Sequence, residues 1–168
     1  MNFQFYLEKL NESEEFKAFV KEMKTAYLCS GYFSIDKEEG GKDNKQSIDF
    51  YVPATKRFFS FSLNDEMKKS EIESFGKDFV PEEISVKTDF DFEEIDKLIV
   101  EKMEEEKISN KVQKIIYSLQ QKDKKPFLLG TIFISGLGLI KIVIDLKSKK
   151  FTLFEKKSLF DMFKIMKK

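Results

Sequence analysis

The sequence predicts an α+β protein of two similar units, each a helix followed by an antiparallel meander, packed together and followed by a short C-terminal helix. Two observations lead to this prediction. Apolar residues recur at helical spacing near the N-terminus and again near residue 95, and each such pattern precedes short segments of alternating apolar and polar residues. The predicted units cover residues 1–66 and 91–168, with a connector over residues 67–90.

The first unit opens with two helical patterns. Apolar residues recur with a helical period after Ser13, which can act as an N-cap because acidic residues follow it directly. We therefore expect a helix over residues 13–25. A similar spacing within residues 3–10 predicts a shorter helix before it.

Three alternating segments follow and predict the first meander. They lie within residues 26–36, 47–52 and 59–63, and polar turns separate them. One face of this meander is apolar, so we expect the preceding helix to cover it. Cys29 shares the apolar face with Phe33 in this pattern, which predicts a buried and unreactive thiol.

The second unit opens at Asp91, which forms a capping-box pattern with Glu94 and predicts a helix over residues 92–106. Residues 108–120 fit both a helix and a strand. We favour a strand over residues 113–119, because a polar turn and a strongly apolar segment follow it.

Gly136 and Gly138 follow an apolar strand and could begin a nucleotide-binding loop. A dinucleotide fingerprint needs a third glycine three residues later, where this sequence has Lys141. The residues after Gly138 alternate as in another strand, so we predict a hairpin turn in which glycine supplies positive φ.

The chain closes with a short strand near residues 151–154 and a helix that Ser158 and Asp161 can cap. The stripe of apolar residues on this final helix predicts that it packs over the adjacent sheet. A basic amphipathic helix of this kind can also lie on an anionic membrane or enter a partner's groove.

The two predicted meanders align with each other. Val52 falls on Ile144, and Phe59 falls on Phe151, so the sequence indicates an internal repeat. The segment IKIVIDLKSKKFTLFE, together with the helix before it, resembles the PepSY domain family and, more loosely, cystatin-like α+β folds. This resemblance implies one helix packed on an antiparallel sheet and a role as an inhibitory or regulatory module.

The composition excludes several chemistries. The chain has no histidine and one cysteine, which removes Ser–His and Cys–His dyads, disulfides within the chain and most zinc sites. Asp36, Asp49 and Asp145 could form a carboxylate pair or bind a hard cation, but nothing in their spacing requires it, and we favour solvated acidic residues at strand ends and polar strand faces. We therefore predict no catalytic, cofactor-binding or metal-binding residue and no enzymatic activity.

The charge is unevenly distributed although the net charge is zero. Residues 1–106 contain 26 acidic and 15 basic residues, whereas residues 107–168 contain 15 lysines and 4 acidic residues. Nucleic-acid binding is disfavoured because arginine, the better phosphate reader, is absent from the basic part. Four lysines cluster around the last hairpin: Lys141, Lys147, Lys149 and Lys150.

The sequence indicates a cytoplasmic protein without a membrane span. The N-terminus has acidic residues within its first dozen positions and no apolar core of a secretory signal. The longest uncharged run, residues 126–140, is shorter than the roughly 20 residues that a spanning helix needs.

These observations predict a non-catalytic interaction or regulatory module that binds a protein or peptide partner. Two alternatives stay open. One is a binder of a small apolar ligand in a cavity lined by phenylalanine, and the other is an anion or nucleic-acid binder that uses the basic C-terminal half. A homodimer is a further partner that the sequence leaves open.

Overall fold

The structure, a computed structural model, describes residues 1–168 except residues 39, 42, 75, 77 and 168. The first two lie in the predicted loop after the first strand, and the next two in the predicted connector. The described strands are β1 (Tyr27–Asp36), β2 (Lys45–Val52), β3 (Arg57–Ser62), β4 (Lys68–Ile72), β5 (Val112–Lys122), β6 (Lys125–Ile134), β7 (Gly138–Asp145) and β8 (Lys150–Ser158). The described helices are α1 (Phe3–Glu12), α2 (Glu14–Glu22), α3 (Phe92–Glu105) and α4 (Leu159–Met166).

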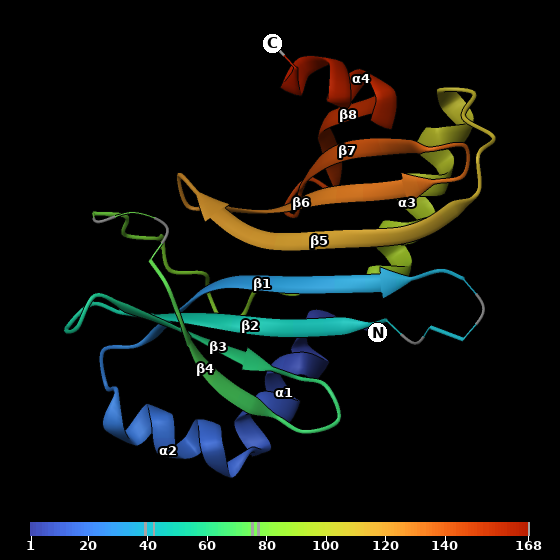
Figure 1. Ribbon diagram of the computed structural model, residues 1–168. Helices are drawn as coiled ribbons and strands as arrows, with labels where there is room; N and C mark the ends of the chain where they lie inside the picture. Colours follow the sequence, from blue (N-terminus) through green and yellow to red (C-terminus); the bar gives the residue numbers. More distant parts are fainter. Residues whose placement is uncertain (39, 42, 75, 77, 168) are drawn as a thin grey trace.

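One antiparallel sheet holds all eight described strands in the order β4-β3-β2-β1-β5-β6-β7-β8 (Figure 1). The prediction of two helix-plus-meander units packed together is therefore wrong, and only the α+β class remains. β1 pairs with β5 from Gly31 opposite Leu119 to Asp36 opposite Lys114. Backbone hydrogen bonds, rather than packed side chains alone, thus join the two halves of the chain.

The predicted connector contains a strand that the sequence pattern did not reveal. β4 pairs with β3 at the sheet edge, where Glu71 lies opposite Phe59. Its sequence KKSEI has little apolar alternation, because an edge strand gains from charged residues that discourage pairing with other chains.

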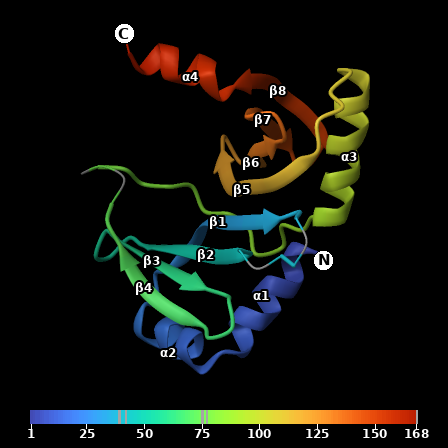
Figure 2. The ribbon, with the colours of Figure 1, turned by 45° about the vertical axis from the view of Figure 1, so that its right-hand side comes forward.

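The helices α1, α2 and α3 cover one face of the sheet (Figure 2). Phenylalanine rings fill the layer between them. Phe19 of α2 lies 5.2 Å from Phe59 and 5.1 Å from Phe61, centroid to centroid. Phe33 of β1 lies 4.9 Å from Phe92 of α3, so the same core continues across both halves of the chain.

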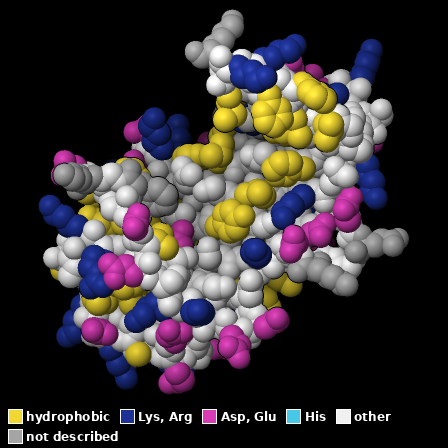
Figure 3. Space-filling model, in the orientation of Figure 1, with side chains coloured by type: hydrophobic (Ala, Val, Ile, Leu, Met, Phe, Trp, Pro, Cys, Tyr) yellow, Lys and Arg dark blue, Asp and Glu magenta, His cyan; other side chains and the backbone are white. Residues whose placement is uncertain are grey.

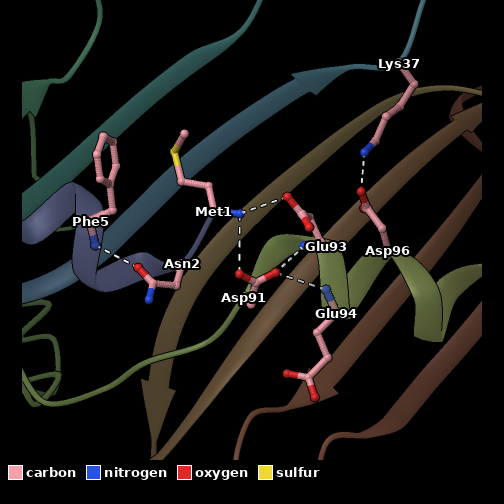
Figure 4. Close-up of polar contacts among 8 residues, drawn as sticks. All are labelled: Met1, Asn2, Phe5, Lys37, Asp91, Glu93, Glu94 and Asp96. Carbon is pink, nitrogen blue, oxygen red and sulfur yellow. Dashed lines mark hydrogen bonds and ion pairs between the residues drawn. The ribbon is translucent and has the colours of Figure 1, made fainter.

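Polar contacts fix the starts of α1 and α3 beside each other (Figure 4). Asn2 Oδ1 accepts a hydrogen bond from the Phe5 N–H at 3.0 Å and caps α1. Asp91 caps α3, because its Oδ1 accepts from the N–H groups of Glu93 and Glu94 at 2.8 and 3.2 Å. The amino group of Met1 lies 3.4 Å from the Asp91 carboxylate.

A second polar contact ties β1 directly to α3. Lys37, just after β1, forms an ion pair with Asp96 (Figure 4). Tyr117 of β5 donates its hydroxyl hydrogen to Asp96 Oδ1 at 3.3 Å, from within the core. Asp96 therefore connects elements from three separate parts of the chain.

The predicted hairpin after Ile134 is present, and residues 112–122 form a strand. Gly136 has φ of 79° and Leu137 has φ of 56°, so these two residues make the reversal. Gly138 instead belongs to β7, where a Cβ atom would lie 3.0 Å from the Ile134 side chain. Positive φ explains the first glycine, and close packing explains the second.

The helix α4 does not pack over the sheet, contrary to prediction. Ser158 caps it by accepting a hydrogen bond from the Asp161 N–H at 3.1 Å. The predicted apolar stripe is Leu159, Met162, Phe163 and Met166. Phe163 and Met166 are 62% and 80% exposed, and the Met162 side chain lies outside the described ones. Within the described part of the chain, no helix combines the length and apolar character needed to cross a membrane, as predicted.

Candidate binding surface

The sheet face opposite α1, α2 and α3, called here the uncovered face, carries a row of side chains that crosses five strands. Strand register places Tyr32 of β1 opposite Ser118 of β5, and Ser118 opposite Leu129 of β6. Leu129 is in turn opposite Val143 of β7, and Val143 opposite Leu153 of β8. The last three residues, Leu129, Val143 and Leu153, are named the apolar row.

The two ends of the apolar row are exposed and Val143 is half-buried, whereas the residues beside the row along β6 and β7 are buried. Leu129 is 41% exposed and Leu153 is 39% exposed, whereas Leu128 and Ile142 are fully buried under α3. Strand residues alternate between the two faces, so these strands are apolar on both. An antiparallel sheet with one solvated face usually carries polar residues there, and the apolar row departs from that pattern.

Hydrophobic side chains gather on this face over β5–β8 and continue onto α4 (Figure 3). The exposed apolar residues of α4 lie beside those of the sheet in the same view. Contiguous exposed apolar surface of this kind marks interaction sites on folded proteins.

Basic residues border the apolar row. Lys141 lies on the uncovered face of β7, opposite Glu155 of β8. The Lys157 ammonium nitrogen is 3.7 Å from Glu155, whereas Lys141 forms no ion pair with any residue that the structure describes. The immediate border of the row is therefore net positive.

A groove of about 630 Å³ lies next to the row, between residues 79–82 and the uncovered face. Tyr27 anchors this segment by donating its hydroxyl hydrogen to the Pro81 carbonyl oxygen at 2.7 Å. Gln121 Nε2 donates to the carbonyl oxygen of Glu83 at 2.6 Å and holds the segment from β5. Apolar side chains form much of the wall: Phe58, Ile72, Phe79, Val80 and Phe127.

Among the described strand residues that line this groove, Asp49 is the one that carries a carboxyl group. Ser30 donates its hydroxyl hydrogen to Asp49 Oδ2 at 3.1 Å, and the Ser60 hydroxyl supplies another hydrogen bond. Burial raises the pKa of the Asp49 carboxyl, and the two serine hydrogen bonds only partly oppose this effect. No lysine or arginine among the described residues forms an ion pair with it.

Cys29 also lines the groove, on the face opposite to the one predicted. The register of β1 shifts between Leu28 and Ser30, and this irregularity turns Cys29 away from the core side. The thiol is still buried, at 6% exposed, and packs in a small cluster with Tyr51 and Phe58. Burial, together with the Asp49 charge, raises the pKa of the Cys29 thiol to about 12, so the thiol is unreactive at neutral pH.

The three aspartates singled out from the sequence do not come together. Asp36 accepts a hydrogen bond from the Glu38 N–H at 2.9 Å, and Asp145 accepts from the N–H groups of Lys147 and Ser148 at 2.8 Å each. These backbone hydrogen bonds lower the pKa of Asp145. Among the described residues, no three histidine, cysteine, aspartate or glutamate side chains form a group that could hold a metal.

The four lysines around the last hairpin also separate. Lys141 faces the apolar row, whereas Lys149 forms a 2.6 Å ion pair with Glu94 of α3. Lys150 pairs across the strand ends with Asp145 in the sheet register. The structure thus spreads these charges over different sides of the hairpin.

The fold and this surface define an α+β protein whose sheet is open on one face. No family model and no curated protein matches the chain. The chain is similar to the crystal structure of a "putative lipoprotein" from Clostridium difficile 630, with a TM-score of 0.55 and 13% identity over 86% of this chain and 91% of that chain. This likeness concerns the fold alone, and the resemblance to PepSY domains stays a prediction.

Proposed function

We propose that the protein is a non-catalytic binding module whose uncovered face holds an amphipathic helix of a protein partner. The observation that carries this proposal is the apolar row, exposed on the sheet face that α1, α2 and α3 leave open. Covering the row would remove apolar surface from water, which stabilises association by roughly 25 cal/mol per Å² before the costs of binding.

The strand pairing favours a helix as the occupant over an extended peptide. β6 and β7 each have a hydrogen-bonded strand on both sides, so an added strand could pair only with the outer edge of β8, beside the row rather than over it. A helix satisfies its own backbone and needs only side-chain contacts. Neighbouring strands are about 4.8 Å apart, close to the ~5–6 Å between helix residues three or four positions apart.

The charge around the row sets the polar character of the partner. Lys141 has no ion-pair partner among the described residues, and Lys157 stands nearby on the same face. A helix with apolar residues on one face and acidic residues beside them complements this arrangement. The α4 of a second copy fits less well, because Lys164 and Lys167 would bring positive charge to a positive border.

A display library of short helices with randomised surfaces tests this proposal. Helices selected on the wild-type protein should be apolar on one face, with flanking Asp or Glu. A double variant, Leu129→Asp with Leu153→Asp, should bind them at least about tenfold more weakly, because two charges would be buried at the contact. The matched control is Val100→Asp, since Val100 is 52% exposed on α3, away from the row.

Circular dichroism should first show that each variant is folded, so that a loss of binding can be assigned to the substituted surface. Equal binding to the wild type, the double variant and the control would refute the proposal. The absence of any helix selected above background would refute it as well.

A further inference from the structure

The Asp49 carboxylate is a largely buried negative charge with no positively charged partner among the described residues. The carboxyl is largely buried in the groove, yet its hydrogen-bond donors are the neutral hydroxyls of Ser30 and Ser60. Buried charges in proteins are normally paired with an opposite charge, because desolvation costs several kcal/mol per ion. Within the described residues, this carboxylate has no such cation.

The carboxylate retains capacity to bind more. An ionised carboxylate offers about four acceptor positions on its two oxygens. The two serine hydroxyls use part of that capacity, and Asp49 lies among the residues that line the groove. A donor that enters the groove could therefore reach the carboxylate without displacing either serine.

The walls of the groove select what can carry such a donor. Phe58, Phe79 and Phe127 line it together with aliphatic side chains, so much of a ligand's body would meet apolar surface. Lys122, at the end of β5, is the one cationic residue among the lining residues, and it forms no ion pair with Asp49. A volume of about 630 Å³ is within the range of small-molecule sites. The ligand that fits is apolar along its length and positively charged at one end.

The other acidic group at the groove is already engaged. Glu82 accepts hydrogen bonds from the N–H groups of Asp123 and Lys124 at 2.8 and 3.0 Å, and these bonds lower its pKa. It therefore closes the β5–β6 turn, leaving Asp49 as the group that meets a ligand. An anionic ligand would be repelled by Asp49, and a neutral apolar one would desolvate its charge without compensation.

From these observations we infer that the groove binds an alkylammonium group, with the ammonium on the Asp49 carboxylate and the alkyl chain against Phe58, Phe79 and Phe127. The charge-assisted hydrogen bond supplies the specificity, and the phenylalanines supply apolar contact. Such a group occurs in free amines and in lysine side chains of proteins. This inference stands on the groove and does not depend on the helix partner of the apolar row.

Isothermal titration of the full chain with three probes of equal chain length tests the inference. n-Hexylammonium should bind at least about tenfold more tightly than n-hexanol, and n-hexanoate should bind least, because only the ammonium pairs with Asp49. Asp49→Asn should abolish the preference for the ammonium. Asp43→Asn is the matched control, since the Asp43 side chain is 70% exposed in a loop.

A fourth probe, Nα-acetyl-lysine N-methylamide, separates the two sources of the group. Tighter binding than hexylammonium identifies a lysine of a protein, and weaker binding identifies a free amine. The inference is overturned if neither amine binds more tightly than hexanol, or if folded Asp49→Asn keeps the preference.

The comparison of the probes on the wild type does not require a variant. Equal binding of hexylammonium and hexanol to the wild-type groove would overturn the inference, even if Asp49→Asn fails to fold.

Discussion

Asp49 is a residue whose burial in the groove carries a stability cost. Its carboxyl lies in the groove with serine donors and no partner of opposite charge among the described residues. For stability alone, the neutral amide of asparagine would suit this position better than the charged carboxylate of aspartate, because it carries no charge to desolvate. The cost is consistent with a site whose positive partner arrives from outside.

The variant Asp49→Asn should therefore be at least as stable as the wild type at pH 7. Burial raises the folded-state pKa of Asp49 above its unfolded value, so ionisation at pH 7 disfavours the folded state. As the pH falls through the folded pKa toward the ordinary value of about 3.9, the wild type gains stability relative to the variant. Urea unfolding of both proteins across this range measures the difference, and an advantage of the variant that grows with acid would contradict the account.

Gly130 is required for packing rather than for an unusual backbone angle. A Cβ atom at this position would lie 2.5 Å from Ile142 Cγ1 and 3.5 Å from Tyr117 Cδ1. Gly130→Ala should therefore lower the free energy of unfolding by about 1–3 kcal/mol, the usual cost of overfilling a core. Urea unfolding measures this cost. The control is Thr131→Ser, at the next position on the uncovered face, which should lower the free energy of unfolding by less than about 1 kcal/mol. If Gly130→Ala were as stable as the wild type, the prediction would be wrong, because the core would have relaxed around the added methyl group.

At the scale of elements, α4 contributes little to the stability of the fold. Its residues Phe160, Phe163 and Ile165 are more than half exposed, whereas Phe19 of α2 is 1% exposed. A helix that buries so little apolar surface gains little from tertiary packing. Its exposed apolar side chains are available to a partner instead.

Truncation of the chain after Leu159 should change the free energy of unfolding by less than about 1 kcal/mol, because little packing is lost. Phe19→Ala, which removes a buried ring, should cost about 3–5 kcal/mol and provides the comparison. Both values follow from urea denaturation at 25 °C. A truncation as costly as Phe19→Ala would mean that α4 is part of the core.

The sequence predicted the elements with strong periodicity and missed those without it. The helices begin close to where Ser13, Asp91 and Ser158 indicated, because capping side chains are local signals. The edge strand β4 was missed because its stability comes from pairing with β3 rather than from its own pattern. Cys29 was predicted on the wrong face of β1, because the register shift between Leu28 and Ser30 cannot be detected from the alternation of apolar and polar residues in the sequence.

At the scale of the whole molecule, the described strands form one sheet, and its main core runs across both halves of the chain. β1 and β5 pair along six residues each, and Phe33 contacts Phe92 across the two halves of the chain. Periodicity assigns the faces of each strand but does not name its neighbours, which is why the joining of β1 to β5 was not predicted. The exposure of the apolar row was not predicted either. Apolar residues on both faces of β6 and β7 are also typical of strands that are buried on both sides.

A continuous sheet predicts a single cooperative unfolding transition. Far-ultraviolet circular dichroism and the fluorescence of the five tyrosines should change together with urea, because both halves share backbone pairing and core. Two separated transitions, or a structured fragment of residues 1–90 alone, would contradict this expectation.

The central claim is that the uncovered face binds a partner helix, and methyl nuclear magnetic resonance tests it most directly. On addition of a helix selected from the library, the methyl signals of Leu129, Val143 and Leu153 should shift. Those of Leu128 and Ile142, which lie on the same strands but face the core, should stay nearly unchanged. Shifts confined to the core or to Val100 on α3, with the apolar row unaffected, would contradict the claim.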